Sequence, residues 1–141
     1  MSRYLSLAAV IVFSISVAAQ SPPKTDKKVQ KATMQRYQKA LSELNSGGKD
    51  KAVAVEAEMR AVIAMVPDFP DAHVALGRAL LLQGKRDAAI VELKQATKLD
   101  PRNVEGQVNL GRALVAKGKL EEAAGALREV IKSDPMSASA H

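Results

Sequence analysis

Few side chains in this 141-residue sequence could perform catalysis. The absence of Cys excludes a thiol nucleophile, a disulfide framework and thiolate-bound metal sites. The two histidines, His73 and His141, lie in no HExxH motif, and the sequence has no GxSxG motif. Glu121 and Glu122 have no partner carboxylate at a defined spacing, and residues 47–50 (GGKD) lack the spacing of a phosphate-binding loop. The sequence therefore predicts a protein that is not an enzyme and that has no cofactor or metal site.

Two arginines are more informative, because they recur at one place in a repeated stretch. Residues 76–85 have the sequence LGRALLLQGK, and residues 110–119 have the sequence LGRALVAKGK. Core packing gives no reason for Arg78 and Arg112 to recur. Their guanidinium groups could bind an acidic side chain or a C-terminal carboxylate. The alternative is that both arginines are solvated and were inherited by duplication.

These stretches belong to a longer repeat. Residues 70–103 and 104–137 align without a gap at an offset of 34 residues, with 13 identities. A fixed period of this size indicates a repeat array. Because the chain is rich in Ala and Leu and only 3% aromatic, helices are favoured over strands.

Each repeat unit is predicted to be a pair of antiparallel helices. Apolar residues at helical spacing precede Gly84 and Gly118, which are suited to end a helix. We expect Gly77 to face Ala89 where the paired helices cross, since a larger side chain would separate the backbones. The same argument places Gly111 opposite Ala123. The predicted fold is all-α, an α-solenoid of stacked antiparallel helix pairs.

The spacing of Leu-Gly, a turn glycine, small residues and a closing Asp-Pro resembles the tetratricopeptide repeat (TPR) family. The matching positions are Leu76-Gly77, Gly84, Ala89, Ala96 and Asp100-Pro101, and then Leu110-Gly111, Gly118, Ala123 and Asp134-Pro135. The resemblance implies a right-handed superhelix and a non-catalytic module that binds a peptide or protein partner in a concave groove. The resemblance places these residues along the groove: Val74, Arg78, Leu81, Leu82, Val108, Asn109, Arg112 and Val115. Such a groove would suit a partner with acidic residues or a C-terminal carboxylate. Only Asn109 falls on a position of the carboxylate clamp of chaperone-binding TPR proteins, so a chaperone tail is not implied.

The period also predicts units on either side of the two clear repeats. Pro67 lies one period before Pro101, so residues 27–69 are expected to form a degenerate N-terminal repeat. Residues 138–141 would begin a further repeat, which suggests a truncated array. In that case the last full helix lacks its cover, and self-association through it is possible. Its outward residues would be Leu120, Leu127 and Ile131.

The net charge of +6 is concentrated in a short arm, because residues 20–36 alone carry +4. The arm has no interleaved aromatic residues and no nucleic-acid motif, so nucleic acid is an improbable partner. An anionic surface that binds the stretch from Lys24 to Arg36 is the alternative.

The first residues resemble an export signal. Arg3 precedes a 13-residue apolar run, and small residues follow at positions 17–19. We expect residues 1–19 to be a signal peptide cleaved between Ala19 and Gln20, and residues 20–26 to be a linker. The run is shorter than the ~20 residues of a membrane span, so the mature chain should have no transmembrane span and should be periplasmic or secreted. Alternatively, the run is an uncleaved anchor, or the chain is an accessory or regulatory subunit of an envelope or secreted enzyme assembly.

Overall fold

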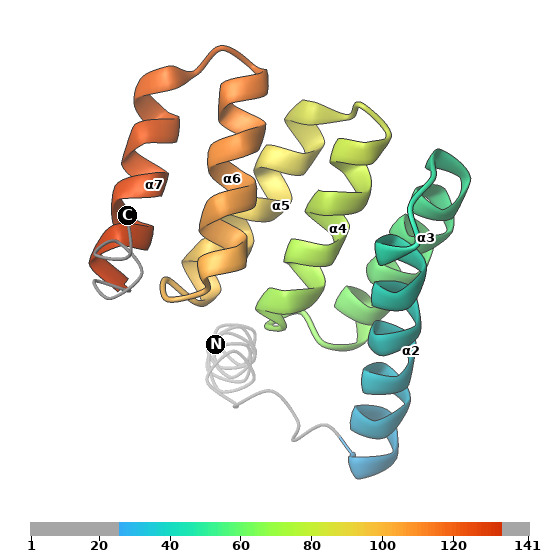
Figure 1. Ribbon diagram of the computed structural model, residues 1–141. Helices are drawn as coiled ribbons and strands as arrows, with labels where there is room; N and C mark the ends of the chain where they lie inside the picture. Colours follow the sequence, from blue (N-terminus) through green and yellow to red (C-terminus); the bar gives the residue numbers. More distant parts are fainter. Residues whose placement is uncertain (1–25, 134–141) are drawn as a thin grey trace, which may run out of the picture.

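The structure, a computed structural model, describes residues 26–133, and this part of the chain forms six α-helices without any strand. The helices are α2 (Lys27–Asn45), α3 (Lys49–Met65), α4 (Pro70–Leu82), α5 (Arg86–Leu99), α6 (Val104–Ala116) and α7 (Leu120–Ser133). Consecutive helices run antiparallel, with α2, α4 and α6 along one side and α3 and α5 behind them (Figure 1). The predicted all-α fold of stacked helix pairs is therefore confirmed. The predicted signal peptide, nearly all of the linker and the start of a further repeat lie outside the described residues.

The turn within each of the last two pairs has the same hydrogen-bond pattern. Gly84 has a φ of +79°, and Gly118 has a φ of +76°, a conformation that side chains with a Cβ rarely adopt. After Gly84, the Lys85 amide donates to the Leu80 carbonyl at 2.9 Å, and the Gly84 amide donates to the Leu81 carbonyl at 3.0 Å. This is a Schellman motif, which satisfies carbonyl groups that a helix end leaves unpaired. The recurring glycine thus sets the turn that reverses the chain within each repeat.

The side chain nearest to the glycine at each helix crossing is a leucine of the second helix. A Cβ atom built on Gly77 would lie 2.5 Å from the Cγ atom of Leu93. A Cβ atom on Gly111 would lie 2.9 Å from Leu127. Ala89, the expected neighbour of Gly77, is buried one helical turn before Leu93. The glycines therefore make room for a branched side chain of the second helix.

One apolar core runs through the pairs from α2 to α7. Its fully buried large side chains are Met59, Leu76, Leu80, Leu93, Leu114, Val55 and Val62. The first helices also contact each other, α2 with α4 and α4 with α6. This side-by-side row of first helices produces the surface on which the candidate site lies.

His73 links α4 to α5 and to the loop that precedes α4, and its ring is buried. Its Nδ1 atom lies 2.8 Å from Glu92 Oε2 on α5, and its Nε2 atom lies 3.0 Å from the carbonyl oxygen of Pro67 before α4. Both ring nitrogens therefore contact groups of the fold itself, in keeping with a packing role.

Candidate functional site: a hollow on the row of first helices

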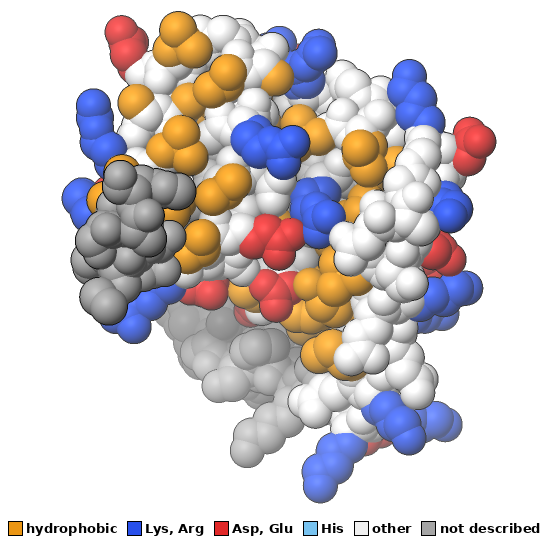
Figure 2. Space-filling view, viewed as in Figure 1, with side chains coloured by type: hydrophobic (Ala, Val, Ile, Leu, Met, Phe, Trp, Pro, Cys, Tyr) orange, Lys and Arg blue, Asp and Glu red, His pale blue; other side chains and the backbone are white. Residues whose placement is uncertain are grey.

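A hollow of about 290 Å³ lies on the face formed by α2, α4 and α6. Its lining, named here the arginine hollow, consists of Leu44, Arg78, Leu81, Leu82, Asn109 and Arg112. Figure 2 shows this face, with basic side chains near its centre, acidic side chains close beside them and apolar side chains around them. The hollow combines apolar walls with positive charge, a combination suited to a segment that has both apolar and acidic groups.

The structure brings together five of the residues predicted for a groove: Arg78, Leu81, Leu82, Asn109 and Arg112. It does not bring Val74 to the hollow, because this side chain is buried between α4 and α6, 3.3 Å from the position of a Cβ on Gly106. Val108 is half-buried and Val115 is exposed on α6, and neither lines the hollow.

Leu44 of α2 is the lining residue that sequence reasoning missed. The 34-residue period could have found it, because Leu44, Arg78 and Arg112 occupy the same repeat position. The prediction stopped at the two clear repeats, since the first pair has Ser42-Glu43 where Leu-Gly is expected. The first pair thus supplies an apolar wall at the position where the others supply a guanidinium group.

The two arginines have different surroundings. Arg78 Nη1 donates to Glu105 Oε1 on α6 at 2.8 Å, and its Nη2 donates to Asn45 Oδ1 on α2 at 3.1 Å. Arg78 therefore ties all three first helices together and is partly neutralised. Arg112 is exposed and has no ion-pair partner within residues 26–133.

Asn109 is fixed at the base of the hollow by its own helix. Its Nδ2 donates to the carbonyl oxygen of Glu105 at 2.9 Å, and only 7% of the residue is exposed. Its amide oxygen has no hydrogen bond to the described part of the chain, so an incoming N–H group could donate to it.

A patch of acidic and phenolic groups adjoins the arginine hollow. Asp71 Oδ1 accepts a hydrogen bond from Asn103 at 2.8 Å, and Glu105 pairs with Arg78. Burial raises the pKa of Tyr37 to about 12, and the carboxylates of Asp71 and Glu105 add to this effect, while Arg78 opposes it. The face therefore changes from positive to negative along α4 and α6, which would orient a charged ligand.

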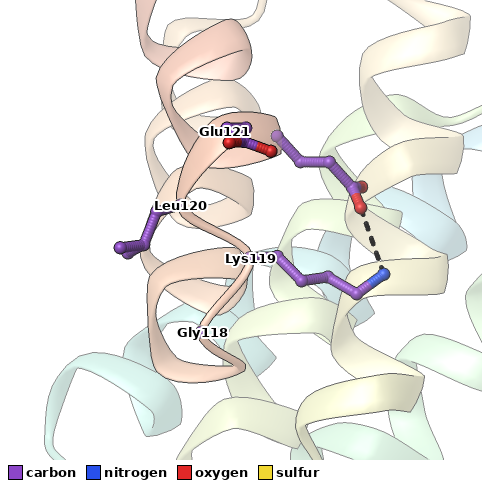
Figure 3. Close-up of a pocket in the computed structure, with 5 residues that line it drawn as sticks. Gly118, Lys119, Leu120 and Glu121 are labelled. Carbon is purple, nitrogen blue, oxygen red and sulfur yellow. Dashed lines mark hydrogen bonds and ion pairs between the residues drawn. The ribbon is translucent and has the colours of Figure 1, made fainter.

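A second hollow, of about 350 Å³, lies at the start of α7 (Figure 3). Its lining residues are the consecutive Gly118, Lys119, Leu120, Glu121 and Glu122. Lys119 and Lys94 pair with Glu122 at 3.2 Å and 3.1 Å, and these hydrogen bonds lower the pKa of Glu122. Because only the residues of one turn line this larger hollow and its lysine is already paired with Glu122, the arginine hollow is the better candidate site.

Within residues 26–133, no group of three or more His, Asp or Glu side chains is arranged to hold a metal ion. In the same range, none of the helices is both long enough and apolar enough to cross a membrane.

Stacked antiparallel pairs with glycine turns define a protein of the helical-repeat class. Two sequence profiles described as tetratricopeptide repeat match the chain, over residues 37–103 and 80–141. The chain therefore belongs to the tetratricopeptide repeat family. The first profile includes most of α2 and all of α3, the pair whose sequence departs most from the repeat pattern.

Several solved structures share this fold. One is the type III secretion translocator chaperone SycD of Yersinia enterocolitica, with 19% identity and a TM-score of 0.69 over 75% of this chain and 78% of SycD. Another holds SycD with a peptide of the translocator YopD, with 19% identity and a TM-score of 0.67 over 73% of this chain and 76% of that one. A solved chain of MamA of Desulfovibrio magneticus, from position 41 to its end, has 24% identity and a TM-score of 0.66, over 72% of this chain and 56% of that one. A search of curated proteins found no significant match.

Proposed function

We propose that this protein is a non-catalytic interaction module that binds a peptide segment of a protein partner in the arginine hollow. The observation that carries the proposal is Arg112, an exposed guanidinium group without an ion-pair partner in the described residues, at the edge of an apolar hollow. An acidic side chain or a C-terminal carboxylate would bind Arg112, and apolar side chains of the same segment would cover Leu81 and Leu82.

The surrounding groups suit an extended segment. Asn109 shares the lining with the two arginines and can accept a hydrogen bond from a backbone N–H of the ligand. Arg78 uses two of its N–H groups within the protein, and its remaining donors can still contact a carboxylate. The acidic patch of Asp71 and Glu105 would repel a second negative charge, so the acidic end of the ligand should lie at Arg112.

The comparison with SycD supports this mode of binding. Its complex with a YopD peptide is an example of a chain of the same fold that binds a segment of another protein. The carboxylate preference proposed here comes from the arginines of this chain alone.

The site of action proposed for the module is outside the cytoplasm. This part of the proposal rests on the sequence of residues 1–19, with cleavage between Ala19 and Gln20. Mass spectrometry of the protein recovered from its native host tests it, since a mature N-terminus at Gln20 is expected. An intact Met1 in the mature protein would contradict export by cleavage.

The binding test uses a labelled ten-residue peptide that contains two leucines and ends in Asp-Glu with a free carboxylate. Arg112→Glu should weaken binding at least tenfold in fluorescence anisotropy, because repulsion replaces attraction. Arg128→Glu on α7 is the matched control, since Arg128 is exposed and does not line the hollow, and this variant should bind as the parent does.

A second peptide, in which glutamine replaces both acidic residues and the C-terminus is amidated, should bind the parent protein weakly. Equal binding of the two peptides, or full binding by the Arg112→Glu variant with unchanged helicity, would refute the proposal. The alternative of an accessory subunit would then be favoured.

A further inference from the structure

The first helix is longer than its counterparts. One period before the start of α4 at Pro70 the chain has Arg36, yet α2 begins at Lys27. Residues 27–35, named here the overhang, add about 13 Å of helix at a rise of ~1.5 Å per residue. Figure 1 shows this blue end of α2 projecting beyond the other helices. The overhang is thus not needed to complete the repeat, and it creates a surface that the other pairs do not have.

Another hollow, of about 260 Å³ and distinct from the two described above, lies between the overhang and the segment before α4. Its lining residues, which define the overhang hollow, are Gln30, Thr33, Met34, Val66 and Phe69. Met34 is 45% exposed, and Phe69 packs on Tyr37 with ring centroids 5.0 Å apart. The hollow shares no lining residue with the arginine hollow.

A buried hydroxyl group in this hollow has no partner. Thr33 is 4% exposed, and its Oγ1 atom makes no hydrogen bond with the described residues. A buried polar group without a partner costs about 1–3 kcal/mol. The oxygen atom is itself covered, so a polar atom of a ligand would remove this cost once neighbouring side chains of the hollow move aside.

Three exposed lysines surround the tip of the overhang. Lys27, Lys28 and Lys31 have no ion-pair partner in the described part of the chain, and α2 has no acidic residue in its first turn. Positive charge is unfavourable at a helix N-terminus, because the helix dipole is also positive there. Lys27 and Lys31, four residues apart, lie on the same side of the helix as Met34. Asp26 at the N-cap, whose side chain accepts a hydrogen bond from the Lys28 amide at 3.4 Å, offsets part of this repulsion, and a negative ligand would relieve the rest.

We propose that the overhang hollow is a second docking site, which takes an acidic, apolar segment of a protein partner. An apolar side chain enters between Met34 and Phe69, a backbone polar group pairs with Thr33 Oγ1, and an acidic side chain binds Lys27 or Lys31. A lipid acyl chain would fill the apolar space but would leave Thr33 without a partner, which favours a peptide over a membrane surface.

The test uses the full chain with the Arg112→Glu substitution, so that a failure of the arginine hollow cannot influence the result. Its methionine methyl groups are labelled with carbon-13 for NMR spectroscopy. The probe is an eight-residue peptide with two central leucines flanked by glutamates. The Met34 methyl signal should shift and saturate, whereas the buried Met59 signal should stay in place.

Two variants examine the contacts separately. Thr33→Val keeps the shape and removes the hydroxyl group, so it should weaken probe binding about threefold to tenfold without loss of thermal stability. Lys27→Glu with Lys31→Glu should weaken binding more than tenfold. Lys49→Glu with Lys98→Glu is the control, because both lysines are exposed away from the hollow, and it should have little effect.

Three outcomes would overturn the proposal. The first is equal binding of the peptide by the Thr33→Val variant. The second is equal binding of a peptide with glutamine in place of glutamate. The third is a Met34 response to phosphatidylglycerol vesicles in the absence of any response to the peptide, which would indicate a membrane surface as the ligand.

Discussion

Gly77 on α4 lies so close to Leu93 on α5 that a Cβ atom would be 2.5 Å from the Leu93 Cγ atom. The equivalent contact in the next pair, Gly111 with Leu127, would be 2.9 Å. The two leucines differ in their freedom to move, because Leu93 is fully buried and Leu127 is 39% exposed. Sequence identity between the repeats therefore conceals unequal tolerance to substitution.

Gly77→Ala should destabilise the fold by about 1–2 kcal/mol, because the clash with the buried Leu93 exceeds the usual gain of alanine in a helix. Gly111→Ala should cost less, since the exposed Leu127 can move aside. Urea unfolding followed by circular dichroism measures both. Equal losses would show that solvent exposure of the leucine does not control the cost.

Gly125→Ala serves as the opposite case. Gly125 lies inside α7, and a Cβ atom there would meet no atom within 4 Å. The substitution should stabilise the protein by about 0.5–1 kcal/mol through helix propensity alone. A loss of stability would indicate that another segment packs closely on this glycine.

Glu105→Gln should increase the affinity for the acidic peptide. It removes the carboxylate that pairs with Arg78 at 2.8 Å and leaves the guanidinium group available to the ligand. Because the pair is partly exposed, the stability cost should be within about 1 kcal/mol. Fluorescence anisotropy with the peptide that ends in Asp-Glu checks the prediction. Weaker binding would mean that Glu105 positions Arg78 for the ligand instead of competing with it.

Acid should weaken the contact between the first two repeats. Hydrogen bonds from Lys85 and Gln83 lower the pKa of Glu56 from 4.5 to about 2. Because the folded-state value is the lower one, Glu56 contributes its stability above pH 4.5 and loses it as the pH falls from 4.5 through about 2. Glu56→Gln should therefore lose on the order of 1 kcal/mol at pH 7. Its unfolding free energy should approach that of the parent near pH 2.

High pH should lower the stability of the fold through ionisation of Tyr37. The folded-state pKa of about 12 lies above the ordinary 10.0, so its contribution to stability is present below pH 10 and is lost as the pH rises toward 12. Tyr37→Phe should be less sensitive over this range, because it keeps the ring contact with Phe69 and cannot ionise. Near-ultraviolet absorbance of the parent and the variant locates the titration. Glu105→Gln should move it toward 10.0.

The repeat register was sufficient to predict the helices and their glycine turns from the sequence. Gly84 and Gly118 have a positive φ at the expected turns, which local chemistry alone requires. The resemblance to the tetratricopeptide repeat family placed Arg78, Leu81, Leu82, Asn109 and Arg112 along a groove, and these residues line one hollow. Their use as a binding site remains a prediction.

What the sequence could not supply depends on contacts between different repeats. Val74 was predicted for the groove but is buried, because Gly106 on the next first helix lets α6 approach it closely. The pairing of Arg78 with Glu105 and Asn45 also joins residues from three helix pairs. A single-repeat pattern carries no information on such cross-repeat distances, so both contacts required the structure.

The second helices α5 and α7 differ in how far neighbouring helices shield them from solvent, and this difference affects the order in which the helix pairs unfold. Leu93 is 0% exposed beneath α6, whereas Leu127, at the same repeat position, is 39% exposed, and Ile131 is 57% exposed. In a linear array each pair is held only by its neighbours, so a pair with one covered side separates at a lower free energy than one with two. Amide protons of α7 should exchange with deuterium first and those of α5 much later. Among the described pairs, α4–α5 alone has a helix pair on each side, so its amide protons should be protected longest, and the pairs on either side should separate at a lower free energy.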